Sequence, residues 1–163
     1  MELADRWYLG LNTGFTLLAG DRFQGVSDSF DMGITFGTRV LYAVNENLAI
    51  GPAVRYSMHP YRSVPGPKTL DMLLVGGQVQ LQEITEAFRF FLSLGGGAAL
   101  TGSDSTGDER GWYVSPTAGV QAIVTNNLSL GITSGLAIVR AAGIPGQEST
   151  FEVPVLFELN YLY

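Results

Sequence analysis

Hydrophobic and polar side chains alternate along most of this chain. Between Trp7 and Leu17 the odd positions carry bulky apolar residues, apart from Thr13, and the even positions carry mostly glycine, asparagine and threonine. A period of two places successive side chains on opposite faces of a β-strand. The pattern returns seven more times and predicts eight strands, each with one bulky apolar face. The apolar faces of the later seven run over residues 32–44, 48–58, 73–81, 88–100, 112–124, 128–138 and 151–163.

The connections between these strands alternate in length, and this alternation predicts the topology. Short connections, typical of hairpin turns, follow strands two, four and six, and long ones follow strands one, three, five and seven. Transmembrane β-barrels have this layout, with short periplasmic turns and longer external loops. We therefore expect a single domain over residues 1–163 with both termini on the periplasmic side. The short connections are 45–47, 83–87 and 125–127, and the long ones 19–30, 59–69, 102–111 and 141–149.

Three prolines, Pro52, Pro116 and Pro154, fall inside predicted strands. Proline cannot donate to the ladder, and a closed barrel has no edge strand on which to place it. We therefore expect bulges at these positions, or strand boundaries that differ slightly from those predicted.

Composition decides which face of the strands is outside. Charged residues make up 15% of the chain, with Lys68 as the single lysine, against about 25% in a soluble domain. If the apolar face pointed inward, as in a soluble barrel, this chain would have too few charged residues to cover the outer surface. The narrow lumen would also have to hold the bulky residues of eight strands. We therefore predict an all-β fold, an eight-stranded antiparallel up-and-down transmembrane β-barrel with small residues inside.

The ends of the apolar faces agree with a membrane environment. Asp71 and Arg140 are the ionisable residues at apolar strand positions, and both are next to a long loop, where a charge costs little. Aromatic residues gather near strand ends, as in the girdles at the two membrane–water interfaces. The predicted periplasmic girdle holds Trp7, Tyr42, Phe88, Phe90, Tyr161 and Tyr163, and the predicted outer girdle holds Tyr56, Trp112 and Phe151.

Charge and residue usage exclude several classes of protein. A net charge of −6 argues against a nucleic-acid partner, which needs a basic face. Without cysteine, neither a disulfide framework nor a thiolate metal site can form. No run of about 18 apolar residues predicts a transmembrane helix. The first residues lack the basic start and apolar core of a signal peptide, so an exported protein is expected here as a mature chain with an added methionine.

The last strand carries the most motif-like feature. Leu159, Tyr161 and the final Tyr163 share one face, which is similar to the C-terminal signature of outer-membrane proteins that the barrel-assembly machinery recognises. With eight strands, the whole chain resembles the small barrels of the OmpA, OmpX and OmpW type. The resemblance implies a bacterial outer-membrane location, with outer-membrane lipids and the assembly machinery as partners. It leaves activity open, because such barrels include anchors, adhesins, small pores and lipid-modifying enzymes.

Five ionisable residues fall on inward-facing strand positions. Arg39 and Glu158 each lie five residues before the periplasmic end of their strands, and only the first strand separates them, so we expect them to pair. One interpretation is a charge network that fills the lumen, since an unpaired buried charge costs several kcal/mol. The alternative is a gate that opens by exchanging partners. The predicted interior network is Arg39, Arg55, Arg89, Glu152 and Glu158.

Other candidate chemistry is weaker. His59, expected at the rim as an interface residue, could form a catalytic set with Asp71 and either Ser57 or Ser63, as lipid A-modifying barrels use Ser, His and an acid. The glycines at 76–77 and 95–97 lie in strands and are not phosphate loops, although they could leave a groove on the lipid face. Asp104, Asp108 and Glu109 could bind calcium, but an acidic loop is more often only solvated. We predict no catalytic residue, cofactor or metal.

The function expected from these features is a non-enzymatic membrane scaffold whose external loops contact the surface or a partner protein, including a membrane protein. The loops are shorter than a plug or catalytic lid usually requires, which favours this hypothesis. The alternative is a narrow transport barrel for small or apolar solutes, with glycine, serine and glutamine lining the lumen. The third possibility is a lipid A-modifying enzyme built around His59.

Overall fold

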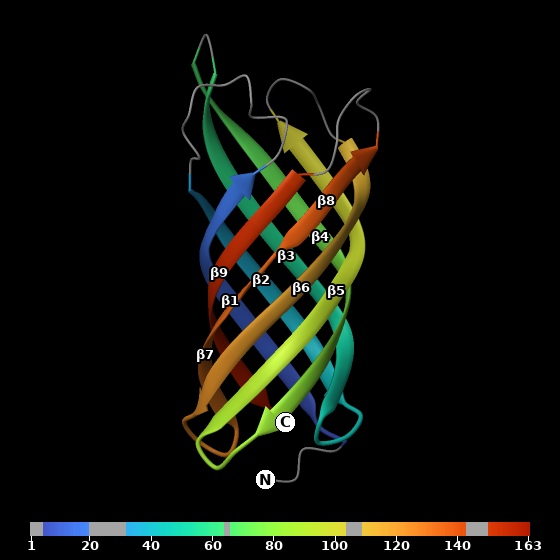
Figure 1. The fold of residues 1–163 in the computed structure, drawn as a ribbon, viewed down its shortest axis with the longest axis vertical. Coiled ribbons are helices and arrows are strands. Elements are labelled where there is room, and N and C mark those ends of the chain that lie inside the picture. Colours follow the sequence, from blue (N-terminus) through green and yellow to red (C-terminus); the bar gives the residue numbers. More distant parts are fainter. Residues whose placement is uncertain (1–4, 20–31, 64–65, 104–108, 143–149) are drawn as a thin grey trace.

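The strands of the computed structural model form one closed antiparallel barrel (Figure 1). The structure describes residues 5–19, 32–63, 66–103, 109–142 and 150–163. No helix in these ranges is long and apolar enough to cross a membrane. The strand segments are β1 (Trp7–Ala19), β2 (Gly33–Ala43), β3 (Leu48–Ser63), β4 (Gly66–Ile84), β5 (Phe88–Ser103), β6 (Glu109–Ile123), β7 (Leu128–Gly135), β8 (Ala137–Ala142) and β9 (Thr150–Leu162).

Each strand pairs with its neighbours in the sequence, and the last strand returns to the first. β9 pairs with β1 from Tyr8 opposite Leu162 to Ala19 opposite Phe151, which closes the sheet. β7 and β8 both pair with β6 on one side and β9 on the other, so they are two parts of one barrel strand. The described chain is therefore an eight-stranded barrel, as the alternation predicted.

Two prolines explain why β7 and β8 are separate segments. In an antiparallel ladder the N–H and C=O of one residue face the same neighbour. The Leu136 N–H donates to the Pro116 carbonyl at 3.0 Å, so Leu136 faces β6 and Gly135 faces β9, where the register places it opposite Pro154. The carbonyls of Gly135 and Leu136 thus both face a residue without an N–H.

The expected bulges at the prolines do not form, and that prediction was wrong. β6 pairs Thr117 with Gly135 and Val114 with Ile138, which is the same register on both sides of the interruption. Pro52 pairs with Gly77 within an unbroken ladder between β3 and β4. The barrel accommodates each proline by losing one hydrogen bond rather than by inserting a residue.

The short connections lie at one end of the barrel, together with the first and last described residues, Asp5 and Tyr163 (Figure 1). They are residues 44–47, 85–87 and 124–127, close to the predicted turns. Two predicted loops were too long, because strands continue into them. β3 and β4 pair as far as Ser63 opposite Gly66, inside the predicted loop 59–69, and β5 and β6 likewise extend into the predicted loop 102–111. Within the described ranges, residues 60–63 and 66–69 have no pairing partner besides each other, and they extend beyond the described ends of the neighbouring strands.

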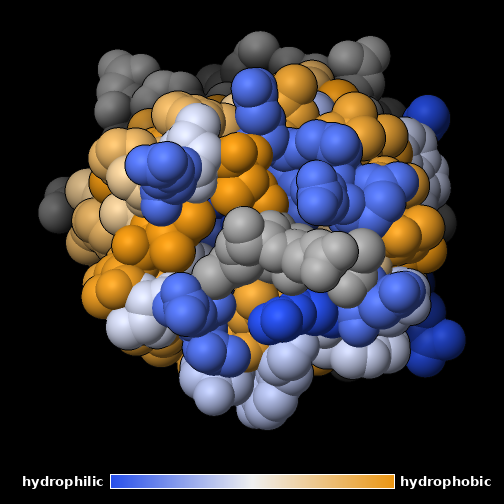
Figure 2. Space-filling view, turned by 90° about the horizontal axis from the view of Figure 1, so that it is seen from below, coloured by the Kyte–Doolittle hydropathy of each residue, from blue (hydrophilic) through white to orange (hydrophobic). Residues whose placement is uncertain are grey.

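The two faces of the barrel differ as the alternation predicted. Bulky apolar side chains such as Phe15, Leu92 and Phe157 are about half exposed on the outer surface. Figure 2, viewed from the end with the short turns, shows hydrophilic residues at this end with hydrophobic residues around them. Inside, buried polar residues share the lumen with three small apolar clusters, which are Tyr8, Leu41, Ala43, Ala49 and Leu162; Leu74, Ala99, Tyr113, Ala137 and Val139; and Leu18, Leu70 and Met72.

Candidate functional site: the filled lumen

A network of side chains crosses the lumen in its half nearer the short turns. Arg39 Nη2 donates to Glu158 Oε2 at 2.8 Å, so the structure brings together the two residues expected to pair. Gln121 Nε2 donates to the same carboxylate oxygen at 2.8 Å. The Arg39 guanidinium also lies over the ring of Phe91, 5.1 Å from its centroid, in cation–π range. These contacts join β2, β9, β6 and β5, so the ion pair bridges the interior rather than adjacent strands alone.

Arg89 extends this network toward the turn end. Its Nη1 donates to Gln121 Oε1 at 3.3 Å, and its guanidinium lies 4.6 Å from the centroid of the Tyr8 ring. Gln82 Nε2 donates to the Tyr8 hydroxyl at 3.2 Å, which adds β4 and β1 to the set of strands in contact. The lower network, defined by Arg39, Glu158, Gln121, Arg89, Tyr8 and Gln82, therefore joins six of the eight barrel strands across the lumen.

A second network lies nearer the long loops. Arg55 Nη2 donates to Glu152 Oε2 at 2.8 Å, and Ser57 Oγ donates to Glu152 Oε1 at 2.6 Å. His59 Nε2 lies 3.5 Å from the same Oε1. Ser57 also contacts Thr35 across β2 and β3 at 3.0 Å. The upper network, defined by Arg55, Glu152, Ser57, His59 and Thr35, thus binds one fully buried carboxylate with three side chains of β3.

The position expected for His59 was wrong. Its side chain is 1% exposed and faces the lumen, whereas a rim position at the membrane interface was predicted. The reason is the length of β3, which continues past His59 to Ser63 and carries the period-two alternation into the predicted loop. Gly33 on β2 leaves the space for this ring, since a β-carbon at Gly33 would overlap His59 Nδ1.

The catalytic set drawn from the sequence is not assembled. Asp71 occupies an outward-facing position of β4, whereas His59 faces the lumen. Ser57 donates to Glu152 Oε1 rather than to His59, so the Ser–His contact that the predicted set requires is not formed. The side chains of Ser63, Asp104, Asp108 and Glu109 lie outside the described residues. Among the described side chains, no group of three or more His, Asp or Glu could hold a metal ion.

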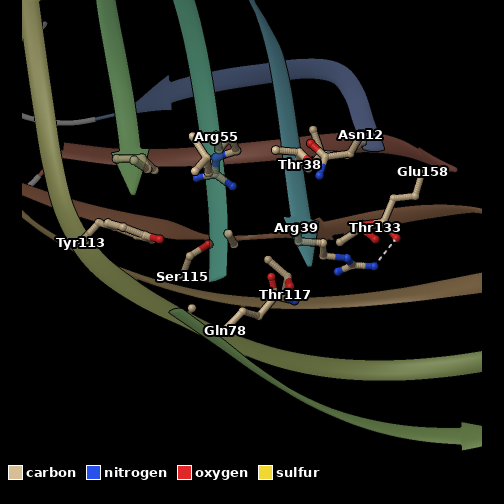
Figure 3. A pocket seen from close by; sticks show the side chains of 15 residues that line it. Asn12, Thr38, Arg39, Arg55, Gln78, Tyr113, Ser115, Thr117, Thr133 and Glu158 are labelled. Carbon is tan, nitrogen blue, oxygen red and sulfur yellow. Dashed lines mark hydrogen bonds and ion pairs between the residues drawn. The ribbon is translucent and has the colours of Figure 1, made fainter. Parts of the chain in front are cut away.

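A small chamber separates the two networks (Figure 3). Its free volume is about 60 Å³, and Arg39 with Glu158 borders one side and Arg55 another. Four of its lining atoms are buried without a hydrogen-bond partner among the described residues: Asn12 Oδ1, Arg55 Nε, Ser115 Oγ and Thr133 Oγ1. A polar space of this size can hold a few water molecules but not an organic solute.

Glycines on inward-facing positions make room for the long charged side chains. A β-carbon at Gly10 would lie 2.9 Å from Arg39 Cγ and 2.6 Å from Asn160 Oδ1. At Gly119 it would overlap the end of the Phe91 ring, the same ring that Arg39 covers. The mid-strand glycines at 77 and 96 face outward and have more space, with the nearest atom 3.9 Å away at Gly77.

The aromatic residues of the predicted girdles lie on the outer surface. At the turn end they form neighbouring pairs, with ring centroids 5.1 Å apart for Trp7 and Tyr42 and 4.8 Å apart for Tyr161 and Tyr163. Phe88 and Phe90 form a looser pair at 6.3 Å. Tyr56, Trp112 and Phe151 are exposed on the half of the barrel nearer the long loops, and Phe151 pairs with Ala19 at the loop end of β1.

Several members of the networks were not singled out from the sequence. Gln121 and Tyr8 connect the charged residues, yet the alternation indicated only that Gln121 faces inward. Tyr8 is an aromatic residue on an otherwise small and polar face, and this exception was the available signal. Three Gln residues, Gln78, Gln80 and Gln82, recur on the inner face of β4, which was visible as a pattern without indicating any partner.

Comparison with known proteins gives similarity in fold. No family model and no curated protein matches the chain. Neisserial surface protein A matches with a TM-score of 0.74 and 12% identity over 95% of this chain and 96% of its own. A second match is Ail, the attachment invasion locus protein of Yersinia pestis, in its complex with the heparin analogue sucrose octasulfate. It has a TM-score of 0.66 and 10% identity over 98% of this chain and 99% of its own. The outer membrane protein OprG of Pseudomonas aeruginosa matches with a TM-score of 0.55 and 11% identity over 98% of this chain and 96% of its own. The chain therefore has the fold of the small outer-membrane β-barrels, as the resemblance implied.

Proposed function

We propose that this protein is a non-enzymatic scaffold of the bacterial outer membrane that acts through its loop end and does not conduct solutes through its lumen. The observation that carries the proposal is the lower network, which joins side chains of β1, β2, β4, β5, β6 and β9 across the interior. The chamber above it has room for water alone. A filled lumen leaves the two ends of the barrel as the surfaces on which a partner can act.

The orientation belongs to the same proposal. The short turns and the described ends of the chain, Asp5 and Tyr163, share one end of the barrel, which we assign to the periplasm (Figure 1). The strand ends that border the long connections lie at the other end, which we assign to the exterior (Figure 1). Outer-membrane lipids then cover the apolar flank, and the C-terminal aromatic strand serves the barrel-assembly machinery. A membrane-protein partner would have to bind the same flank or the loops.

The hairpin of residues 60–63 and 66–69 is the element on which we place partner contact. Among the described residues its strands have no further pairing partner at this height, so their outer edges could pair with another chain. Pro60 and Pro67 occupy one strand each and limit such pairing. Arg62 and Lys68 make the segment basic in a chain of net charge −6, which favours an acidic partner. Ail, of similar fold, was solved with a polyanionic heparin analogue.

Recording from planar lipid bilayers tests the closed lumen. We expect the wild-type protein to show no conductance above the bare bilayer. The double variant Arg39→Ala with Glu158→Ala removes the central ion pair, and its measurable conductance would establish that insertion and detection succeed. Steady wild-type conductance, or swelling of liposomes in a small sugar, would instead support the alternative of a narrow pore.

Lipid A mass spectra from cells with and without the protein should be identical, and a new modified species would contradict the non-enzymatic assignment.

Binding to immobilised heparin, a soluble polyanion, tests the role of the hairpin. Protein in lipid vesicles is expected to bind at low salt and to be released as salt screens the contact. The variant Arg62→Glu with Lys68→Glu should lose this binding. The matched control, Arg110→Glu with Arg140→Glu, reverses two charges that lie outside the hairpin. Equal losses in both variants would show that the hairpin has no particular role.

A further inference from the structure

The charges inside the described lumen do not balance. Three arginines and two glutamates face inward, and each glutamate already pairs with one arginine, Glu158 with Arg39 and Glu152 with Arg55. Arg89 is left without a carboxylate within 4.0 Å among the described residues. It is nevertheless 4% exposed. A buried cation without a counter-charge costs several kcal/mol, so this site has an electrostatic demand that the described side chains leave unmet.

The contacts of Arg89 satisfy only part of its guanidinium. One N–H donates to the amide oxygen of Gln121 at 3.3 Å, and the face of the group lies over the Tyr8 ring. Its Nε is buried without a hydrogen-bond partner among the described residues. Asn160 Nδ2 is a second buried donor without a partner there, while Asn160 Oδ1 accepts from Arg39. Both free atoms are donors, and donors require an acceptor.

These two residues line the same recess at the turn end of the barrel. The recess is bounded by Arg89, Asn160, Ser129, Tyr8 and the turn at residues 125–127. Its free volume is about 10 Å³, which is space for a single oxygen-sized atom. Ser129 Oγ donates to Gln121 Oε1 at 3.2 Å and holds the amide that Arg89 uses. The recess is therefore small, rich in donors and next to an uncompensated positive charge.

We propose that this recess binds one anionic oxygen of a small carboxylate or phosphate, which enters from the turn end and keeps the rest of the molecule outside. A water molecule could accept from Arg89 Nε and Asn160 Nδ2 but would not neutralise the charge. A cation is excluded by the charge of Arg89 and by the two free donors. Charge-assisted hydrogen bonds from arginine to an oxyanion are shorter and stronger than neutral ones, and they suit a site with room for one atom.

NMR of the arginine side chains in neutral detergent micelles tests the proposal directly. Sodium acetate and inorganic phosphate are the two probes, each titrated at constant ionic strength against sodium chloride. The Nε–H signal of Arg89 should move saturably with one or both oxyanions, whereas the signal of exposed Arg140 should not. Equal movement of both arginines, no movement, or the same response to chloride would overturn an oxygen-specific site. The relative affinities for acetate and phosphate identify which of the two groups the site prefers.

Two variants separate binding from general folding effects. Asn160→Asp places a carboxylate on the recess that Arg89 also lines, so the variant should unfold at higher denaturant concentration than the wild type without added anion. It should also lose the response of the Arg89 signal to acetate and phosphate. Arg89→Met removes the charge and should abolish any stabilisation by these anions while the barrel still folds. An undiminished response in folded Asn160→Asp would refute the assignment. The outcome is independent of the conductance test, because oxyanion binding at the turn end does not require the lumen to be closed.

Discussion

At the scale of single residues, the lumen depends as much on its glycines as on its charges. Gly10 lies on β1 between Arg39 of β2 and Asn160 of β9, and it pairs with both in the ladder. The Arg39 side chain crosses over this position to reach Glu158. The ion pair across β1 is therefore possible because the intervening residue has no side chain.

Replacement of Gly10 by alanine should test this dependence. The added β-carbon would lie 2.9 Å from Arg39 Cγ, closer than packed carbon atoms allow, so Arg39 must move away from Glu158. We expect a loss of about 1–3 kcal/mol in the free energy of unfolding, as for other overpacked sites. Gly77→Ala is the matched control, because its β-carbon meets no atom closer than 3.9 Å, and its effect should stay within about 0.5 kcal/mol. Denaturant titration in lipid vesicles measures both, and equal losses would contradict the explanation.

Alternation in the sequence was sufficient to place residues inside or outside, but not to choose their partners. Counting from strand ends placed Arg39 and Glu158 at one level, because β1 between them runs in a continuous register with both neighbours. The bond from Gln121 to Glu158, and the placement of Arg89 over Tyr8, depend on how far strands on opposite sides of the barrel are staggered. That stagger is a property of the closed sheet and is not encoded in any one strand.

At the scale of elements, the strands were easier to predict than their ends. Period two identified each strand because its two faces meet different environments, but it did not show where β3 ends. β3 continues to Ser63, past its predicted end at residue 58, which explains the error at His59. The prolines show a related limit. The sequence revealed that Pro116 lacks an N–H donor, but it did not reveal that the Leu136 carbonyl is the acceptor left without a partner.

Pro116→Val should therefore strengthen the junction between β7 and β8. Pro116 is exposed on the outer face, so valine fits there and its N–H can donate to the Leu136 carbonyl. The gain of one ladder hydrogen bond should add about 0.5–1.5 kcal/mol to the free energy of unfolding. Hydrogen exchange of the Leu136 amide should slow, while exchange at Ile132, in the middle of β7, should stay unchanged. An unchanged rate at Leu136 would mean that the missing donor does not cause the interruption.

At the scale of the whole molecule, one asymmetry organises the structure: bulky apolar residues outside, small and charged residues inside. Bulk composition did not reveal it, because 46% hydrophobic residues is ordinary for a soluble protein. The low content of charge, together with the narrow interior of eight strands, determined which face was outside. The same reasoning could not reveal the chamber or the recess, since both depend on the exact packing of side chains from several strands.

The apolar flank makes the membrane assignment testable by depth. Leu94 lies about half-way along β5 and is 56% exposed, while Val124 lies in the turn after β6 and is 54% exposed. In a soluble protein, arginine at these two equally exposed positions should have similarly small effects. In a bilayer, Leu94→Arg should cost about 2–4 kcal/mol because it lies near the midplane, and Val124→Arg about 0–1 kcal/mol near the interface. Reversible unfolding from lipid vesicles measures the difference, and the same pair in detergent micelles provides the comparison. Equal costs in vesicles would place the flank outside the hydrocarbon and would remove the physical basis for treating this barrel as transmembrane.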